Sequence, residues 1–182
     1  KPQDIGKAVD HITVQYRKQS MFKNNLILMD ILANFNWERP ISFSSGGIHD
    51  DENIFYLNDY LQFDGFTYRL VPIQTKEDEN NGDMGRVDAD DLYNIVNNFR
   101  WGNFKDLNVH FDETCTQNIM SYRTAASRAA EGLSLKGERA KAIEVLDLAA
   151  KEIPSSKYGD PRSLSPMVYG YIIYGQEQKR LK

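Results

Sequence analysis

Two short β-prone runs in the first half of the chain constrain its fold most. The stretches 36–44 and 56–73 each end in such a run, and an aromatic segment typical of a helix lies between the runs. Because Pro40 disfavours the α conformation at Arg39, any helix before it must end earlier. Pro72 lacks the N–H that a central strand needs, so the second run ends at a sheet edge or terminus. The pattern predicts two neighbouring strands joined by a crossover, within an α/β fold.

The segments around these strands predict further elements. Residues 21–35 carry apolar side chains around most of a helical surface, which is typical of a buried helix. Residues 12–16 alternate in polarity as a strand does, and residues 51–63 favour a short helix. Residues 74–85 are acidic and rich in Asn, which is typical of a solvated loop. We therefore expect residues 1–110 to form an α/β domain with a small sheet of two or more strands flanked by helices.

The last third of the chain is helical by pattern. Helices are predicted over residues 112–135, 138–153 and 165–174, and a shorter helix is predicted over residues 90–99. Small and apolar residues recur in this region at the offsets of a tetratricopeptide-like repeat. These residues are Ala130, Gly137, Ala142, Leu146, Ala149 and Pro154. Because one repeat cannot bury its faces alone, residues 111–182 should pack on the first domain or continue in a longer protein.

The overall composition argues against several classes of function. The chain has 182 residues and a formal net charge of −4, without the basic stripe that nucleic-acid binding requires. Cys115 is the only cysteine, so an intrachain disulfide or a thiolate metal cluster cannot form. The longest apolar run, residues 26–33, is far shorter than the roughly 20 residues that cross a bilayer. A chain that starts with Lys1 and Pro2 is expected to be a piece of a longer protein.

Clusters of polar residues offer little for catalysis. Residues 49–52 read His-Asp-Asp-Glu, but adjacent side chains rarely converge on one metal ion, so a polar loop before a helix is favoured. Residues 88–91 lack the glycine and distal glutamate of a calcium loop and favour a helix cap. The turn over residues 44–47 could hold an anion on its backbone N–H groups, although a tight turn is favoured. We expect no catalytic residue, no metal and no cofactor.

Aromatic and arginine side chains remain as candidates for binding. Exposed rings could stack on sugars, whereas most rings in a domain of this size belong to the core. Arg39 and Arg69 stand beside the two predicted strands. Each could contact a ligand, and the favoured alternative is an internal ion pair with Asp59 or Asp64. The candidate binding residues are Trp37, Arg39, Gly46, Gly47, Tyr60 and Arg69.

The chain also resembles a known family over about residues 20 to 155. The resemblance is carried by the first predicted helix, the two strand motifs and the start of the helical region. The residues concerned are Asn24 to Leu26, Asp30 to Asn34, Trp37 to Phe43, Tyr60, Leu61, Gly65, Tyr68 to Ile73 and Asp112 to Thr114. They resemble the soluble C-terminal region of the DUF2723 family. Its members are bacterial multi-spanning membrane proteins that look like protein O-mannosyltransferase-type glycosyltransferases.

The resemblance implies a location and a role. Transferase chemistry would belong to the membrane-embedded N-terminal part of the parent protein, and this chain would lie on the extracytoplasmic (periplasmic) side. We expect a non-catalytic accessory domain that binds acceptor protein or glycan, or organises the complex. Its partners would be the N-terminal membrane domain and the acceptor, and not nucleic acid. The alternatives are a protein-interaction module built on the helical repeat, or a stand-alone hydrolase or transferase using carboxylates near Asp59 or Asp64.

Overall fold

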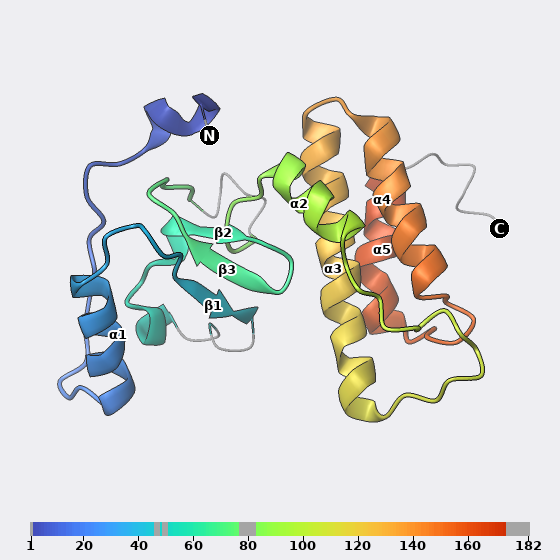
Figure 1. Ribbon diagram of the computed structural model, residues 1–182, viewed down its shortest axis with the longest axis horizontal. Helices are drawn as coiled ribbons and strands as arrows, with labels where there is room; N and C mark the ends of the chain where they lie inside the picture. The colour runs from blue at the N-terminus through green and yellow to red at the C-terminus, as the bar shows by residue number, and fades with distance from the viewer. Residues whose placement is uncertain (1, 46–47, 49–50, 77–82, 174–182) are drawn as a thin grey trace. The chain divides into compact units, whose positions relative to one another are not determined.

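The computed structural model describes residues 2–45, 48, 51–76 and 83–173 and contains two compact units (Figure 1). The sheet unit comprises Lys1–Phe63 and Thr67–Arg86, and the helical unit comprises Asp64–Phe66 and Val87–Lys182. The chain therefore passes from one unit to the other after Arg86, whereas the sequence predicted a domain boundary after residue 110. The difference arises because the helix that follows Arg86 packs with the later helices.

A three-stranded antiparallel sheet is the frame of the sheet unit. Its strands are β1 (Ser42–Ser44), β2 (Leu61–Phe63) and β3 (Thr67–Leu70), in the order β1-β3-β2. Arg69 in the central strand lies opposite Ser42 on one side and Gln62 on the other. The two predicted strands, β1 and β3, are therefore neighbours, and the α/β class with a small sheet is confirmed. They pair directly, and the segment between them adds the third strand.

The helix predicted over residues 51–63 does not form. Two short 3-10 helices stand there, η3 (Asp51–Ile54) and η4 (Asn58–Tyr60), and β2 follows at once. Phe55 and Tyr56, between the two 3-10 helices, have φ values of 54° and 57°. These left-handed values interrupt a right-handed helix. The apolar side chains of this segment therefore reach the interior from turns and not from one face of a helix.

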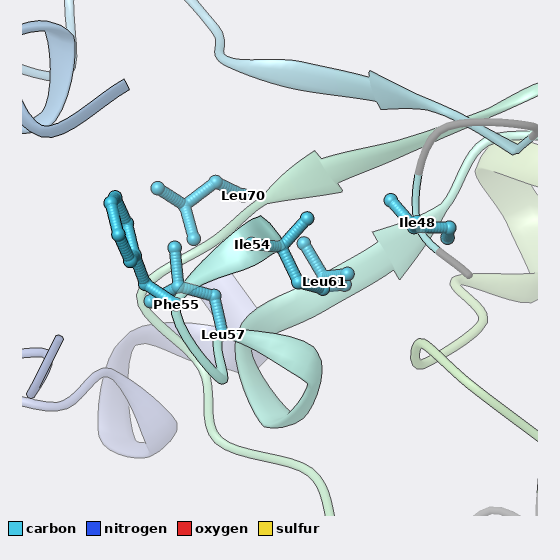
Figure 2. Packing of buried hydrophobic residues seen from close by; sticks show 6 residues of the cluster. All are labelled: Ile48, Ile54, Phe55, Leu57, Leu61 and Leu70. Carbon is cyan, nitrogen blue, oxygen red and sulfur yellow. The ribbon is translucent and has the colours of Figure 1, made fainter. Parts of the chain in front are cut away.

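Six buried side chains form the core of the sheet unit (Figure 2). They are Ile48, Ile54, Phe55, Leu57, Leu61 and Leu70. Tyr16 packs edge-on against Phe55, with 5.8 Å between the ring centroids. Burial of one such side chain stabilises a fold by about 1.5–3 kcal/mol. Since half of the cluster comes from residues 54 to 57 and only Leu61 and Leu70 lie in strands, this segment contributes more side chains to the core than the strands do.

The first residues of the chain pack against the rest of the sheet unit. The 3-10 helix η1 (Pro2–Lys7) holds Asp4, whose carboxylate pairs with the Arg86 guanidinium at 3.2 Å. The two side chains are only 10% and 14% exposed. The strand predicted over residues 12–16 is absent, and this described segment has no regular secondary structure. The N-terminal segment is thus held by a buried ion pair, by the antiparallel bridge between Ala8 and Ile73, and by a hydrogen bond from the Gln15 N–H to the Phe55 oxygen at 3.2 Å.

Helix α1 (Lys23–Ala33) lies where the sequence predicted it, but it is far more exposed than predicted. Leu28 and Leu32 are half-buried against the core. By contrast, Ile27 is 61% and Ile31 is 48% exposed. The prediction of a buried helix is therefore wrong. A core of three short strands covers one narrow face of the helix and leaves its other apolar positions open.

The helical unit contains four α-helices within its described residues. They are α2 (Ala89–Asn97), α3 (Glu113–Leu135), α4 (Arg139–Glu152) and α5 (Pro161–Ile173). Asp88 and Asp112 begin α2 and α3, and each carboxylate accepts a hydrogen bond from the backbone N–H three residues later, at 3.2 and 2.8 Å. Gly137, with φ of 81°, follows the end of α3. These positions confirm the predicted helices, except that Tyr174, the predicted last residue of the third helix, lies outside the described residues.

Helix α3 is central and packs against α2, α4 and α5 (Figure 1). Glycines allow close approach between α3 and α2 and between α5 and α4. A Cβ at Gly132 would lie 3.0 Å from the Ala89 Cβ, and a Cβ at Gly170 would lie 2.9 Å from the Leu146 Cδ2. Such spacing leaves no room for added atoms. The predicted helical hairpin of α3 and α4 is present, whereas its tetratricopeptide-like character stays a prediction.

Candidate functional site

Two of the predicted binding residues lie in the segment before β1. Trp37 is 49% exposed, and its ring packs against Phe35 with 4.5 Å between the centroids. Arg39 is exposed and makes no ion pair within the described part of the chain. The predicted partner Asp59 instead accepts a hydrogen bond from Gln74 Nε2 at 3.1 Å. The internal ion pair predicted for Arg39 is therefore wrong, and its guanidinium faces solvent.

The other predicted binding residues belong to the frame of the sheet unit or fall outside the described residues. Tyr60 is half-buried against the core, and Arg69 is half-buried at the middle of β3. Gly46 and Gly47, with the predicted anion-binding turn, lie outside the described residues. A hollow of about 290 Å³ beside α1 contains none of these candidates. Its lining residues are Val14, Tyr16, Met29, Leu32 and Ala33.

The helical unit carries a hollow of about 460 Å³ with aromatic walls. This aromatic hollow is lined by Phe66, Gly102, Phe104, Phe111, Cys115, Asn118 and Tyr122. The Phe66 and Tyr122 rings contact each other at 4.7 Å between centroids, as do the Phe104 and Phe111 rings. Trp101 extends the cluster at 5.2 Å from Tyr122. The volume lies within the range of about 300–1,000 Å³ that is usual for ligand pockets.

The loop between α2 and α3 builds one wall of the aromatic hollow. Gly102 and Asn103 have φ values of 62° and 64°, so the chain reverses sharply after Trp101. Farther along, the Lys157 ammonium donates to the backbone oxygen of Asp106 at 2.8 Å and to that of Val109. The Lys157 ammonium therefore anchors the loop between α2 and α3. This loop in turn positions the Phe104 and Phe111 rings.

Polar groups around the aromatic hollow are few. The Tyr122 O–H donates to the Arg100 backbone oxygen at 3.2 Å, and burial raises the pKa of this phenol. The hydrogen bond from the backbone N–H of Cys115 lowers the pKa of Asp112, and a hydrogen bond of the Cys115 side chain with the same carboxylate raises the pKa of the thiol. At neutral pH Asp112 is therefore charged and Cys115 is not. The Asn118 amide makes only a long bond of 3.4 Å to the preceding turn of α3.

A second hollow, of about 580 Å³, lies along the other flank of the first half of α3. Its lining residues are Glu113, Thr116, Gln117, Ile119, Met120, Lys157, Tyr158, Gly159, Asp160, Arg162 and Ser163. Near it, Arg123 is 1% exposed and donates to Ser163 Oγ at 2.6 Å and to the backbone oxygens of Ile153 and Tyr158 at 3.3 and 3.0 Å. Burial lowers the pKa of this guanidinium. Arg123 thus ties the loop before α5 to α3, which is a structural role.

The chemistry that these residues support is binding. The described residues contain no group of three or more side chains placed to hold a metal ion. No helix in the same part of the chain is both long and apolar enough to cross a membrane. The aromatic hollow offers ring surfaces and, at Asn118, one amide that can donate and accept hydrogen bonds.

Sequence reasoning missed this hollow, because none of the candidate binding residues that it singled out lines it. The available signal was the density of rings just before α3, at Phe99, Trp101, Phe104 and Phe111. Aromatic side chains at this density in a loop indicate packing and not solvent exposure. The participation of Phe66 could not be predicted, because it lies far from these residues in the sequence.

The fold defines a mixed α/β chain with a small sheet unit and a larger helical unit, and the helical unit carries the aromatic hollow. Residues 1–91, half of the 182 residues, match the family TMEM260-associated domain 2. The chain belongs to this family. No curated protein and no solved structure matches it significantly. The matched region ends within α2, so α3, α4 and α5 lie beyond it, and membership in the DUF2723 family stays a prediction.

Proposed function

We propose that the chain is a non-catalytic accessory domain of a membrane glycosyltransferase-like protein of the DUF2723 type. It lies on the extracytoplasmic side of a bacterial membrane and binds acceptor protein or glycan. The observation that carries the proposal is the aromatic hollow, whose ring surfaces suit an apolar side chain or the face of a sugar. The family description as an associated domain supports a role within a larger assembly.

The exposed surface of the sheet unit supports the N-terminal membrane domain of the parent protein as a partner. Ile27, Ile31 and Trp37 are 61%, 48% and 49% exposed and lie in or just after α1. Several large apolar side chains exposed near one another are typical of an interaction surface. In this proposal the sheet unit docks on the parent protein, and the helical unit receives the acceptor.

A second candidate function is a protein-interaction module built on the helices. Helix α5 favours it, because its last two turns expose large apolar side chains. They are Val168, Tyr169, Ile172 and Ile173, between 40% and 52% exposed. Helices that stack in a series leave such a face on the last helix. In this alternative the partner is a helix that covers α5, and the aromatic hollow has no ligand.

Tryptophan fluorescence tests the first candidate. The chain has two tryptophans, so Trp37→Phe leaves Trp101 as the only tryptophan, 5.2 Å from the Tyr122 ring of the hollow. Titration of this variant with soluble oligosaccharides and with unstructured polypeptides should give a saturable change in emission for at least one class. Cys115→Phe in the same background fills the hollow and should abolish the change. If neither class changes the emission, the aromatic hollow does not bind an acceptor.

A further inference from the structure

The walls of the aromatic hollow discriminate between the two classes of acceptor. We infer that the hollow receives an apolar side chain of a polypeptide whose neighbouring residues are basic. The inference rests on the proposed function and deepens it, because it selects protein over glycan as the acceptor. It follows from the polar groups on the walls, from the shape of the ring cluster and from the charges beside it.

The walls offer too few hydrogen-bond partners for a sugar. No carboxylate among the described residues lines the hollow, although Asp112 directly follows the lining residue Phe111 in the chain. The Tyr122 hydroxyl already donates to the Arg100 backbone oxygen at 3.2 Å. The Cys115 thiol is neutral and a weak donor. A sugar that entered would therefore bury several hydroxyl groups without partners, which opposes binding.

The same walls suit one apolar side chain and its backbone. Phe66, Phe104, Phe111 and Tyr122 present rings at tilted and edge-on angles around the hollow. An inserted aromatic or branched side chain would meet ring edges and faces at distances usual for aromatic pairs. The Asn118 amide is exposed and makes only a 3.4 Å internal bond, so it can pair with a peptide N–H or C=O. A polypeptide supplies the apolar side chain and, directly beside it, the backbone N–H and C=O groups that can pair with Asn118.

The charged groups beside the hollow favour a polypeptide that carries basic residues next to the inserted side chain. Asp112 and Glu113, at the start of α3, are both exposed, and Asp112 is ionised at neutral pH. His110 is exposed nearby and also lowers the pKa of Asp112. Of the lysines near the hollow, Lys157 is held by two backbone oxygens of the loop, and Lys105 pairs with Glu152 at 3.1 Å. Lys or Arg residues on either side of the inserted side chain would therefore meet acidic groups, which speeds and strengthens association.

Cys115 makes the test direct, because it lines the hollow, is exposed and is the only cysteine. The rate of its alkylation by N-ethylmaleimide is measured on the complete chain by intact-mass spectrometry. The probes are a capped Lys-Lys-Gly-Phe-Gly-Lys-Lys peptide, the same peptide with Ser for Phe, and the neutral trisaccharide maltotriose. At ten times its Kd, the Phe peptide should slow alkylation about tenfold by mass action. The Ser peptide and the trisaccharide should leave the rate unchanged.

Two pairs of variants locate the contact, read by the anisotropy of the dye-labelled Phe peptide. Asn118→Trp blocks the mouth of the hollow and should weaken binding at least tenfold, whereas Thr114→Trp, exposed on the same helix and outside the hollow, should not. Asp112→Asn keeps a cap on α3 but removes a charge. It should weaken binding about twofold to fivefold, as expected for one exposed charge pair. Thr114→Gln controls for substitution near the start of α3.

The outcomes separate the inference from the proposed function. Protection of Cys115 by the Phe peptide alone supports both. Protection by the trisaccharide and not by the peptide overturns the inference and leaves the proposed function standing. Protection by neither overturns both. Equal binding by the wild type and Asn118→Trp places the peptide elsewhere on the chain and also overturns the inference.

Discussion

The helical unit and the sheet unit are stabilised in different ways. In the helical unit, Gly132 and its neighbours let helices approach closely, and the buried Arg123 ties a loop to α3. In the sheet unit, Phe55 enters the core from a left-handed turn, and the Asp4–Arg86 pair joins the first residues to the last. The first arrangement depends on regular helices and on close contacts between them. The second depends on particular turns and on contacts between distant residues.

The largest expected effect belongs to Arg123 in the helical unit. Arg123→Ala removes hydrogen bonds to three acceptors in residues 153–163 and leaves a cavity in place of a fully buried side chain. We expect a loss of about 3–5 kcal/mol in the free energy of unfolding, measured by urea denaturation. Arg162→Ala is the control, because that side chain is 91% exposed and should change stability by less than about 0.5 kcal/mol. A loss from Arg123→Ala as small as that of the control would show that the loop before α5 does not depend on this residue.

The corresponding test of the sheet unit is its buried ion pair. Arg86→Ala removes the guanidinium charge from beside the Asp4 carboxylate, which is only 10% exposed, so we expect a loss of about 2–3 kcal/mol. The same urea denaturation measures it. Lys18→Ala is the matched control variant. The Lys18 and Glu52 side chains, which form an ion pair, are each about one-third exposed, so this pair should contribute at most about 1 kcal/mol to stability. Equal losses for the two variants would mean that the burial of the Asp4–Arg86 pair does not matter.

The same difference between the units explains what the sequence could predict. Helix starts at Asp88 and Asp112 and the stop at Gly137 were predictable, because caps act within one turn. The neighbouring strands β1 and β3 were predictable from their β-prone runs. The structure of residues 51–63 was not predictable, because left-handed φ values at Phe55 and Tyr56 break an aromatic segment whose spacing is helical.

The candidate site was less predictable than the fold. The aromatic hollow combines Phe66 with rings from residues 104–122, and the sequence gives no sign that these segments meet. The predicted candidates Tyr60 and Arg69 are instead half-buried in the sheet unit. Arginine and aromatic residues beside a strand serve packing and binding equally well, so residue type alone could not separate these roles.

A smaller effect is expected where a turn of the sheet unit requires glycine. Gly85 has φ of +76°, and a Cβ there would lie 2.8 Å from the Tyr68 Cδ1. Gly85→Ala should therefore cost about 2 kcal/mol from backbone strain and overpacking, measured as a lower denaturation midpoint. Gly6→Ala is the control, because nothing lies within 4 Å of its Cβ position and its φ is not in the left-handed region. If the control destabilises as much as Gly85→Ala, the turn is not what makes residue 85 sensitive.

The smallest expected effect tests the exposed side of α1. Ile31 is 48% exposed, so Ile31→Ser should change the free energy of unfolding by less than about 0.5 kcal/mol. Leu32→Ser, one residue along and half-buried against the core, should cost about 1–2 kcal/mol. A large loss from Ile31→Ser at high protein concentration, absent on dilution, would show that α1 is covered by another copy in solution. A loss independent of concentration would place Ile31 in the core and remove the contrast between the two units at this helix.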